Sequence, residues 1–221
     1  MGHYYVALHT YQRRNRIPKT YKRTTQKGSV YLQMRYRILL VALEAELPYK
    51  QAPNDYKVVY TGVGKVNAAF AATQAIAEAH SLGFHPEVYN YGTVGSCLPE
   101  LTGMHRITKF VQRDMNAEPQ APRGVTPFEA GLPYLDFSPD MTPSLTLGTG
   151  DQFVHELEPW LVENNIQVVD MEAYAIAHVC KRMNVQFTCY KYITDYVGTP
   201  HQADTWQKNV ANGAEEVLQI L

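Results

Sequence analysis

The sequence is short of cysteine and has no long apolar run. Its 221 residues include three cysteines, Cys97, Cys180 and Cys189, an odd number with no metal-type spacing. This argues against a disulfide framework and favours a reducing, cytoplasmic location. No apolar run approaches the ~20 residues that cross a bilayer, so no membrane partner is expected. With 45% hydrophobic and 19% charged residues, the composition is typical of a soluble globular protein.

Acidic residues are missing from the first 43 positions. Glu44 is the first, whereas nine of the 20 Lys and Arg residues precede it. Residues 1–33 also lack apolar periodicity, so they could form a nucleic-acid-binding arm or a targeting segment. The simpler interpretation is a disordered or non-native extension, because Met34 opens the strand-like "MRYRILLVALEAEL". We predict a basic extension over 1–33 and one domain over 34–221, with nucleic acid not expected as a partner.

Strand patterns alternate with helical patterns through the rest of the chain. "YRILLVAL" and "PEVYNYGTVG" are typical of strands, and an alanine stripe after "TGVG" is typical of a helix that stops at Gly83. Residues 119–143 are proline-rich and predict a long loop. The last 19 residues predict one closing amphipathic helix that starts near Ala203 or Asp204. The alternation predicts a single-domain α/β sandwich of three layers, with a central mixed sheet flanked by helices.

Carboxylates interrupt the apolar segments "VVDMEAYAIAHVC" and "YITDYVG". Burying an unpaired carboxylate costs several kcal/mol, so Asp170, Glu172 and Asp195 need a reason to be there. Helix capping would explain Asp170. Glu172, near the start of a helix, could instead accept hydrogen bonds from a vicinal diol. Asp195 fits a turn cap and a general acid equally well.

Glycine turns follow three of the predicted strands. "TGVGKV" lacks the Walker A spacing, so a tight turn at Gly64 is the simplest interpretation, although the helix start there could face a ligand. "NYGTVGSC" offers the hydroxyls of Thr93 and Ser96 beside free backbone amides. "GTGDQFV" presents Phe153, which is either a core residue or a surface on which a base stacks.

Six motifs in this order resemble the nucleoside phosphorylase/nucleosidase superfamily. They are most similar to those of its bacterial 5′-methylthioadenosine/S-adenosylhomocysteine nucleosidases and related purine nucleosidases. The resemblance runs from residue 36 to the end of the chain. The matching pieces are "VALEAEL", "TGVGKVNAA", "YNYGTVGSCLP", "TGDQFV", "VVDMEAYAIAHVC" and "YITD".

The resemblance implies a role for each candidate site residue. Glu46 would activate the attacking water, and Asp195 would protonate or hydrogen-bond purine N7. The ribose would lie on Met171 with its diol on Glu172. The base would stack on Phe153 and be read by the backbone of Val154. In supporting roles, Gly64 would form the turn and Thr93 would orient Asp195. If the motif is aligned with the family in a shifted register, Ser96 would orient Asp195 instead.

The implied reaction is hydrolysis of the N-glycosidic bond of a purine nucleoside by a homodimer, with no metal or organic cofactor. A phosphate-dependent phosphorylase is the alternative, disfavoured because "ILLVALEAEL" and "NYGTVG" carry no arginine for phosphate and Glu46 would repel it. An alternative of another class is a non-catalytic nucleoside- or nucleic-acid-binding protein that uses the basic arm. Departures from the family in the loop after Thr93 leave the 5′ substituent of the substrate open.

Overall fold

The computed structural model describes residues 20–26, 29–129, 132–139 and 144–221. Its strands are β1 (Thr20–Gln26), β2 (Ser29–Val41), β3 (Tyr56–Tyr60), β4 (Pro86–Ser96), β5 (Met104–Gln112), β6 (Leu135–Asp136), β7 (Leu145–Thr149), β8 (Val168–Asp170) and β9 (Gln186–Tyr196). Its α-helices are α1 (Lys65–Ser81), α2 (Pro159–Glu163), α3 (Ala173–Arg182), α4 (Gln202–Asn209) and α5 (Ala214–Ile220). Within the described ranges, none of these helices has the length and apolar content needed to cross a membrane.

The strands form one mixed sheet, as the sequence predicts. β2 pairs in parallel with β3 and β4, and β4 pairs in parallel with β9. β9 continues to β5, β5 to β7, β7 to β8, and β8 returns to β4, so five strands close a circuit. The carboxyl ends of β4 and β9 lie side by side because these strands are parallel, and Gly95 and Ser96 at the end of β4 pair with the short antiparallel strand β8.

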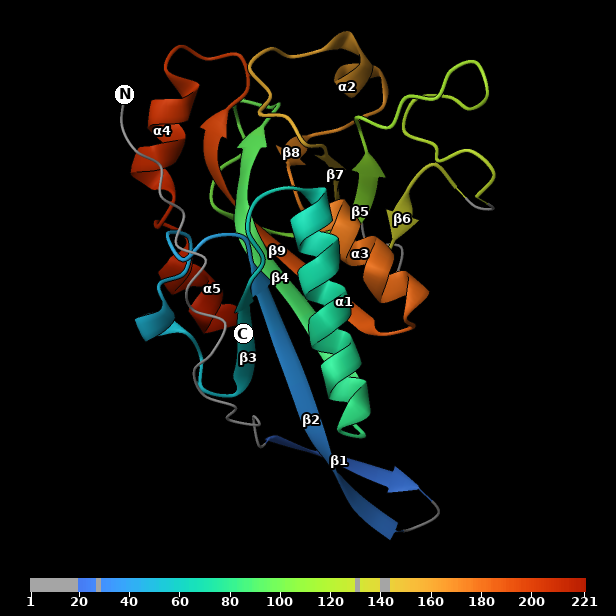
Figure 1. The fold of residues 1–221 in the computed structure, drawn as a ribbon. Coiled ribbons are helices and arrows are strands. Elements are labelled where there is room, and N and C mark those ends of the chain that lie inside the picture. The colour runs from blue at the N-terminus through green and yellow to red at the C-terminus, as the bar shows by residue number, and fades with distance from the viewer. Residues whose placement is uncertain (1–19, 27–28, 130–131, 140–143) are drawn as a thin grey trace.

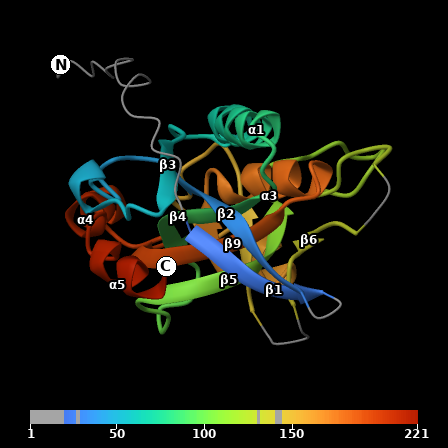
Figure 2. The same cartoon turned by 90° about the horizontal axis from the view of Figure 1, so that it is seen from below.

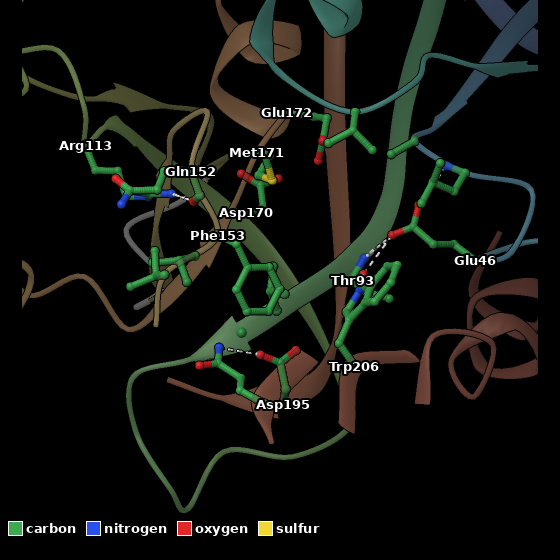
Figure 3. Close-up of a pocket in the computed structure, with 18 residues that line it drawn as sticks. Glu46, Thr93, Arg113, Gln152, Phe153, Asp170, Met171, Glu172, Asp195 and Trp206 are labelled. Carbon is green, nitrogen blue, oxygen red and sulfur yellow. Dashed lines mark hydrogen bonds between the residues drawn. The ribbon is translucent and has the colours of Figure 1, made fainter. Parts of the chain in front are cut away.

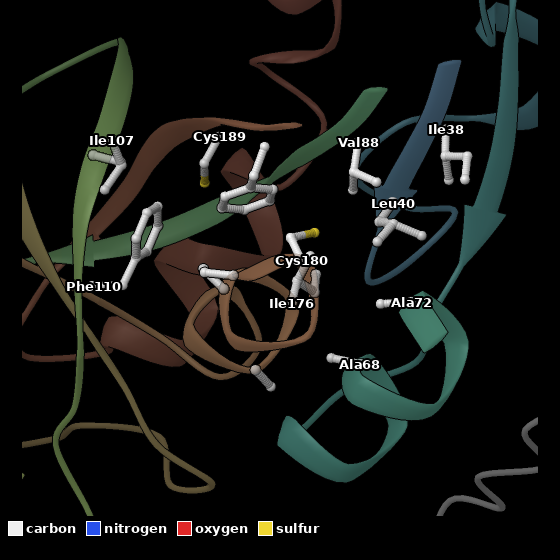
Figure 4. Packing of buried hydrophobic residues seen from close by; sticks show 14 of the residues in the cluster. Ile38, Leu40, Ala68, Ala72, Val88, Ile107, Phe110, Ile176, Cys180 and Cys189 are labelled. Carbon is white, nitrogen blue, oxygen red and sulfur yellow. The ribbon is translucent and has the colours of Figure 1, made fainter. Parts of the chain in front are cut away.

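Helices cover both faces of the sheet, which gives the three predicted layers (Figures 1 and 2). Alternating residues of β2 divide between the layers. Ile38 and Leu40 pack with the alanines of α1 and with α3 in the larger core (Figure 4). Leu39 and Val41 point the other way and pack against α5. This alternation is the period-2 pattern of a strand that is buried on both faces.

The N-terminal segment enters the sheet earlier than the sequence predicts. β2 begins at Ser29 and pairs with β1 as an antiparallel hairpin, so the expected boundary between Gln33 and Met34 falls inside a strand. The hairpin extends past the end of the sheet (Figure 1). Its strands are rich in Thr, Tyr and Val, which favour extended backbone. Residues 1–19 lie outside the described residues, so the proposed extension over 1–33 stays a prediction.

The closing segment is two helices and not the single helix predicted. α4 begins at Gln202, and α5 begins at Ala214 after a break at Gly213. The break coincides with a close approach of the backbone to β9, since a Cβ on Gly213 would lie 2.5 Å from Cγ of Tyr192. The predicted stop of α1 is confirmed, because Gly83 has a positive φ of 82° just after the helix.

Candidate active site

A cavity of about 250 Å³ opens at the carboxyl ends of β4, β8 and β9. Ligands collect at this kind of sheet edge in α/β folds. Seven of the eight residues expected in the site line it: Glu46, Thr93, Phe153, Val154, Met171, Glu172 and Asp195 (Figure 3). The eighth, Gly64, lies behind the wall and donates its backbone N–H to Glu172 Oε1 at 2.9 Å. The motifs, far apart in the sequence, therefore converge on one cavity.

Glu46 is held by a turn that follows β2. Its N–H donates to the Leu43 carbonyl at 3.0 Å, and the Leu43 N–H donates back to Glu46 Oε2 at 3.1 Å. The backbone N–H and the hydroxyl of Thr93 both donate to Oε1 at 2.8 Å. Glu46 is only 4% exposed as a residue, and its carboxylate has three donors for about four acceptor positions. It is a fixed acceptor, and its remaining acceptor position, on Oε2, can serve a molecule in the cavity.

Thr93 contacts a different acid from the one expected. Its hydroxyl donates to Glu46 and accepts from the Trp206 indole N–H at 3.1 Å, so the expected contact with Asp195 is not formed. The alternative residue, Ser96, does not form it either, because its hydroxyl bonds to the backbone of Leu98. The physical reason is the register of β4 and β9, which places Gly95 opposite Asp195 and leaves Thr93 opposite Tyr192, within reach of Glu46.

Asp195 is held by two other side chains. The Thr194 hydroxyl donates to Oδ1 and the Gln202 amide donates to Oδ2, both at 2.7 Å. Gln202 in turn accepts from the Gly198 N–H at 3.3 Å, which fixes which end of its amide faces the acid. Gly95 leaves room for the acid, since a Cβ there would lie 3.1 Å from Oδ2. Asp195 is 2% exposed as a residue, and it still reaches the cavity wall.

Asp170, which also lines the cavity, holds the start of α3 as the capping interpretation predicts. Its Oδ2 accepts from the Ala173 N–H at the start of α3, and its Oδ1 accepts from the Thr149 hydroxyl. It also forms an ion pair with Lys191, whose Nζ lies 2.9 Å from Oδ2. A Cβ on Gly92 would lie 2.9 Å from this Nζ and 3.3 Å from Glu46 Oε1, so the amine lies beneath the floor of the site.

The charge of Glu172 depends on its buried surroundings. Burial raises its pKa to about 7, and the neighbouring charge of Asp170 adds to the effect. Lys191 and the Gly64 N–H act in the opposite direction. The carboxyl group therefore changes charge near neutral pH and has one oxygen already held by a backbone donor. Met171 precedes it at the cavity wall.

The loop after β7 forms the aromatic end of the cavity. Phe153 faces the space, and Val154 beside it is 7% exposed, with both residues outside helices and strands. Arg113, 1% exposed at the end of β5, donates to the carbonyls of Gly150 and Gln152 and so holds this loop. Burial lowers the pKa of the Arg113 guanidinium, with Asp114 opposing that change.

Four site residues escaped the sequence interpretation: Arg113, Lys191, Gln202 and Trp206. The sequence does carry a signal for Lys191, because burying a charged residue of the apolar strand "TCYKYITD" is as costly as burying Glu172 or Asp195. Gln202 and Trp206 gave no such signal, since a polar or aromatic residue on a surface helix is ordinary. Among the described residues, no group of three or more His, Cys, Asp or Glu is placed to hold a metal ion.

Two sequence comparisons relate the chain to known proteins. The family model of the phosphorylase superfamily matches residues 54–221. A curated relative, the 5′-methylthioadenosine/S-adenosylhomocysteine nucleosidase of Marinomonas sp. (strain MWYL1), is 26% identical over 190 residues. The match covers 75% of this chain and 79% of the relative.

Solved structures share the fold. The futalosine hydrolase of Helicobacter pylori strain 26695 matches with a TM-score of 0.71 and 20% identity, covering 83% of this chain and 94% of the other. A mutant Helicobacter pylori 5′-methylthioadenosine nucleosidase, solved with 5′-methylthioadenosine in its active site, matches with a TM-score of 0.70 and 19% identity, covering 85% and 96%. At these identities the likeness shows the fold, a mixed sheet flanked by helices, as the sequence predicts.

Proposed function

The chain belongs to the phosphorylase superfamily, and from this premise we propose that it hydrolyses the N-glycosidic bond of a purine nucleoside, releasing the free base and a ribose derivative. The membership confirms the resemblance drawn from the six motifs. One observation carries the proposed reaction: Glu46, Glu172 and Asp195 come from three separate elements and surround a single cavity (Figure 3). Polar groups that converge on one cavity are typical of a ligand-binding site.

Cleavage of an N-glycosidic bond develops positive charge on the sugar and negative charge on the base. The same charge pattern governs glycoside hydrolysis, in which two carboxyl groups flank the breaking bond. Asp195 would deliver a proton to purine N7, which makes the base a better leaving group. Glu46 would take a proton from a water molecule as its oxygen attacks C1′ on the opposite face of the sugar. The C1′–N9 bond breaks with its electron pair leaving on the base, which takes the Asp195 proton, and the water oxygen forms the new C1′–O bond as its proton goes to Glu46.

Glu172 is suited to hold the ribose. A carboxylate can accept from both hydroxyls of a vicinal diol. Its negative charge would also stabilise the cationic sugar of the transition state more than the neutral ground state. Met171, beside it at the wall, would pack against the sugar ring.

The aromatic end of the cavity is suited to a purine. The Phe153 ring offers a face for stacking. The backbone of Val154 lies outside the strands, so its N–H and C=O can read the edge of the base.

Water is favoured over phosphate as the nucleophile by the donors around Glu46. The N–H groups of Leu43 and Thr93, with the Thr93 hydroxyl, would suit an anion. All three already donate to the carboxylate of Glu46. An incoming phosphate would have to displace this side chain and bear its negative charge. The one arginine at the wall, Arg113, is occupied by backbone carbonyls of the base loop.

We infer a homodimer from an exposed apolar surface beside the cavity. Val63, which lines the cavity, is 42% exposed, and Val66 and Phe70 on α1 are 80% and 69% exposed. Scattered exposed apolar residues are normal, but a group beside a ligand site marks an interaction surface. The double variant Val66→Glu, Phe70→Glu should be a monomer by light scattering; an unchanged mass would count against this surface.

We also propose a cytoplasmic location, which the three free cysteines fit.

A substrate panel tests the function. Purified protein is given methylthioadenosine, S-adenosylhomocysteine, futalosine, adenosine and inosine, each with and without inorganic phosphate, and base release is followed. The relative and the solved structures named above act on more than one of these, so the panel also identifies the 5′ substituent. We expect release from at least one nucleoside without phosphate. Release only with phosphate, yielding ribose 1-phosphate, would establish the phosphorylase alternative, and no release would reject both.

A further inference from the structure

One face of α4 makes polar contacts with the strands that carry the site. Gln202, Trp206 and Asn209 are spaced four and three residues apart, so they lie on the same face of the helix. Gln202 donates to Asp195, and Asn209 donates to the Thr194 carbonyl at 2.8 Å. Trp206 donates to Thr93. The helix is therefore anchored at both ends, with the indole held between the anchors.

The contacts of Trp206 form a chain with a fixed direction. An indole N–H can only donate, so the Thr93 oxygen must accept from it, at 3.1 Å. The hydroxyl of Thr93 has a single proton, and that proton points to Glu46 Oε1 at 2.8 Å. With one lone pair taken by Trp206, the hydroxyl is restrained from turning to use its proton elsewhere. Trp206 thus orients the Thr93 hydroxyl, which in turn holds the Glu46 carboxylate.

We propose that Trp206 is a positioning residue for the reaction, acting through Thr93 to hold the Glu46 carboxylate in line with the attacking water. The inference rests on the proposed hydrolase function. It assigns a role to the indole N–H, as distinct from the apolar ring that lines the cavity. A neighbouring donor also polarises the hydroxyl and strengthens the hydrogen bond it makes.

Trp206→Phe separates the two roles, because phenylalanine keeps an aromatic ring and lacks the donor. We expect kcat to fall at least threefold, in the range of about 3- to 10-fold for one lost hydrogen bond, with KM changed less than twofold. The matched control is Trp160→Phe, which changes the chain's other tryptophan. Trp160 lies on α2 against Arg123 and is absent from the cavity wall, so kcat should not change.

A double-mutant cycle with Thr93→Val tests whether Trp206 acts through Thr93. If it does, Trp206→Phe should cost little in the Thr93→Val background, and the two effects should not add. Thr93→Ser, which keeps the hydroxyl, should restore the sensitivity to Trp206→Phe. Additive effects would show that Trp206 acts by another route and would overturn the inference.

The hydrogen bond itself can be observed without turnover. The chain has two indole N–H groups, and the one missing from the nitrogen–proton NMR spectrum of Trp206→Phe belongs to Trp206. Its signal should shift in Thr93→Val, while that of Trp160 should not. An unmoved signal, or a kcat loss below threefold in Trp206→Phe, would overturn this inference alone. A wild-type protein that releases no base from the panel would overturn the proposed function and this inference with it.

Discussion

Lys191 and Asp170 form an ion pair in the floor of the site, with Nζ 2.9 Å from Oδ2 and both side chains 1% exposed. Burial alone would lower the pKa of the amine, but the charge of Asp170 raises it, with smaller contributions from Glu172 and Glu46. Lys191 is therefore a buried cation whose charge interacts with those of three acids, Asp170, Glu172 and Glu46. It makes their burial in one small region tolerable.

Lys191→Met should destabilise the protein strongly. Removing the cation leaves Asp170 buried without its partner, and breaking such a pair costs about 3–5 kcal/mol. Urea unfolding measures the loss. The control is Lys57→Met, which breaks the Lys57–Glu78 pair, whose side chains are 23% and 36% exposed; exposed pairs contribute about 0–1 kcal/mol. Equal losses in the two variants would contradict the assignment, and adding Asp170→Asn to Lys191→Met should recover part of the stability.

Asp195→Asn should abolish most of the base release while leaving the fold intact. An amide cannot supply the proton, and general acids contribute about 10²–10⁴-fold to rate. The amide can still bond to both Thr194 and Gln202, so the melting temperature should change little. Asp204→Asn on α4 is the control, because that side chain is 66% exposed, far from the buried contacts. Normal turnover by Asp195→Asn would reject Asp195 as the acid.

The sequence predicts the acids of the site because their signal is local. An acid at the end of an apolar strand is costly wherever the strand lies, and this signal marks Glu172 and Asp195 without knowledge of neighbours. The mixed sheet and its flanking helices follow from alternating strand and helix patterns in the same way. The stop of α1 at Gly83 also needs only local information.

Contacts between segments that are distant in the chain could not be predicted from the sequence. Thr93 was expected to contact Asp195, and nothing in "NYGTVG" shows that its hydroxyl meets the turn of Glu46 instead. The break before α5 depends on how closely Gly213 approaches Tyr192, a residue 21 positions away. Gln202 and Trp206 matter because of what α4 packs against. Such facts are set by tertiary packing, which overrides local propensity.

Arg113→Met should weaken substrate binding more than catalysis. The guanidinium donates to two carbonyls of the loop that carries Phe153, and its loss frees that loop. Hydrogen bonds from charged groups are worth about 1.5–3 kcal/mol, so KM should rise by at least about 10-fold with kcat nearly unchanged. Steady-state kinetics measures both constants. Arg106→Met, at an exposed arginine of β5, the strand that precedes Arg113, should leave both unchanged. A fall in kcat alone would contradict a role in holding the base loop.

Glu172 should make the protein less stable as the solution becomes more basic. Its pKa rises from 4.5 to about 7 on burial, so between these values the folded state binds more protons than the unfolded state. Stability therefore falls as pH rises from about 4.5 to about 7, and the loss is complete above the folded pKa. Above pH 7 the buried Glu172 is ionised, and the folded protein is then less stable than it is with Glu172 neutral.

Glu172→Gln removes this titration and keeps an oxygen for the Gly64 N–H. The melting temperature of the variant relative to wild type should therefore rise between pH 5 and pH 8. Its kcat/KM should fall most above pH 7, where wild-type Glu172 is a carboxylate able to hold the ribose and stabilise its positive charge. Thermal unfolding at several pH values measures the first effect. Glu163→Gln, an exposed acid on α2, should show no pH-dependent difference. A difference between Glu172→Gln and wild type that is the same at pH 5 and pH 8 would contradict the raised pKa.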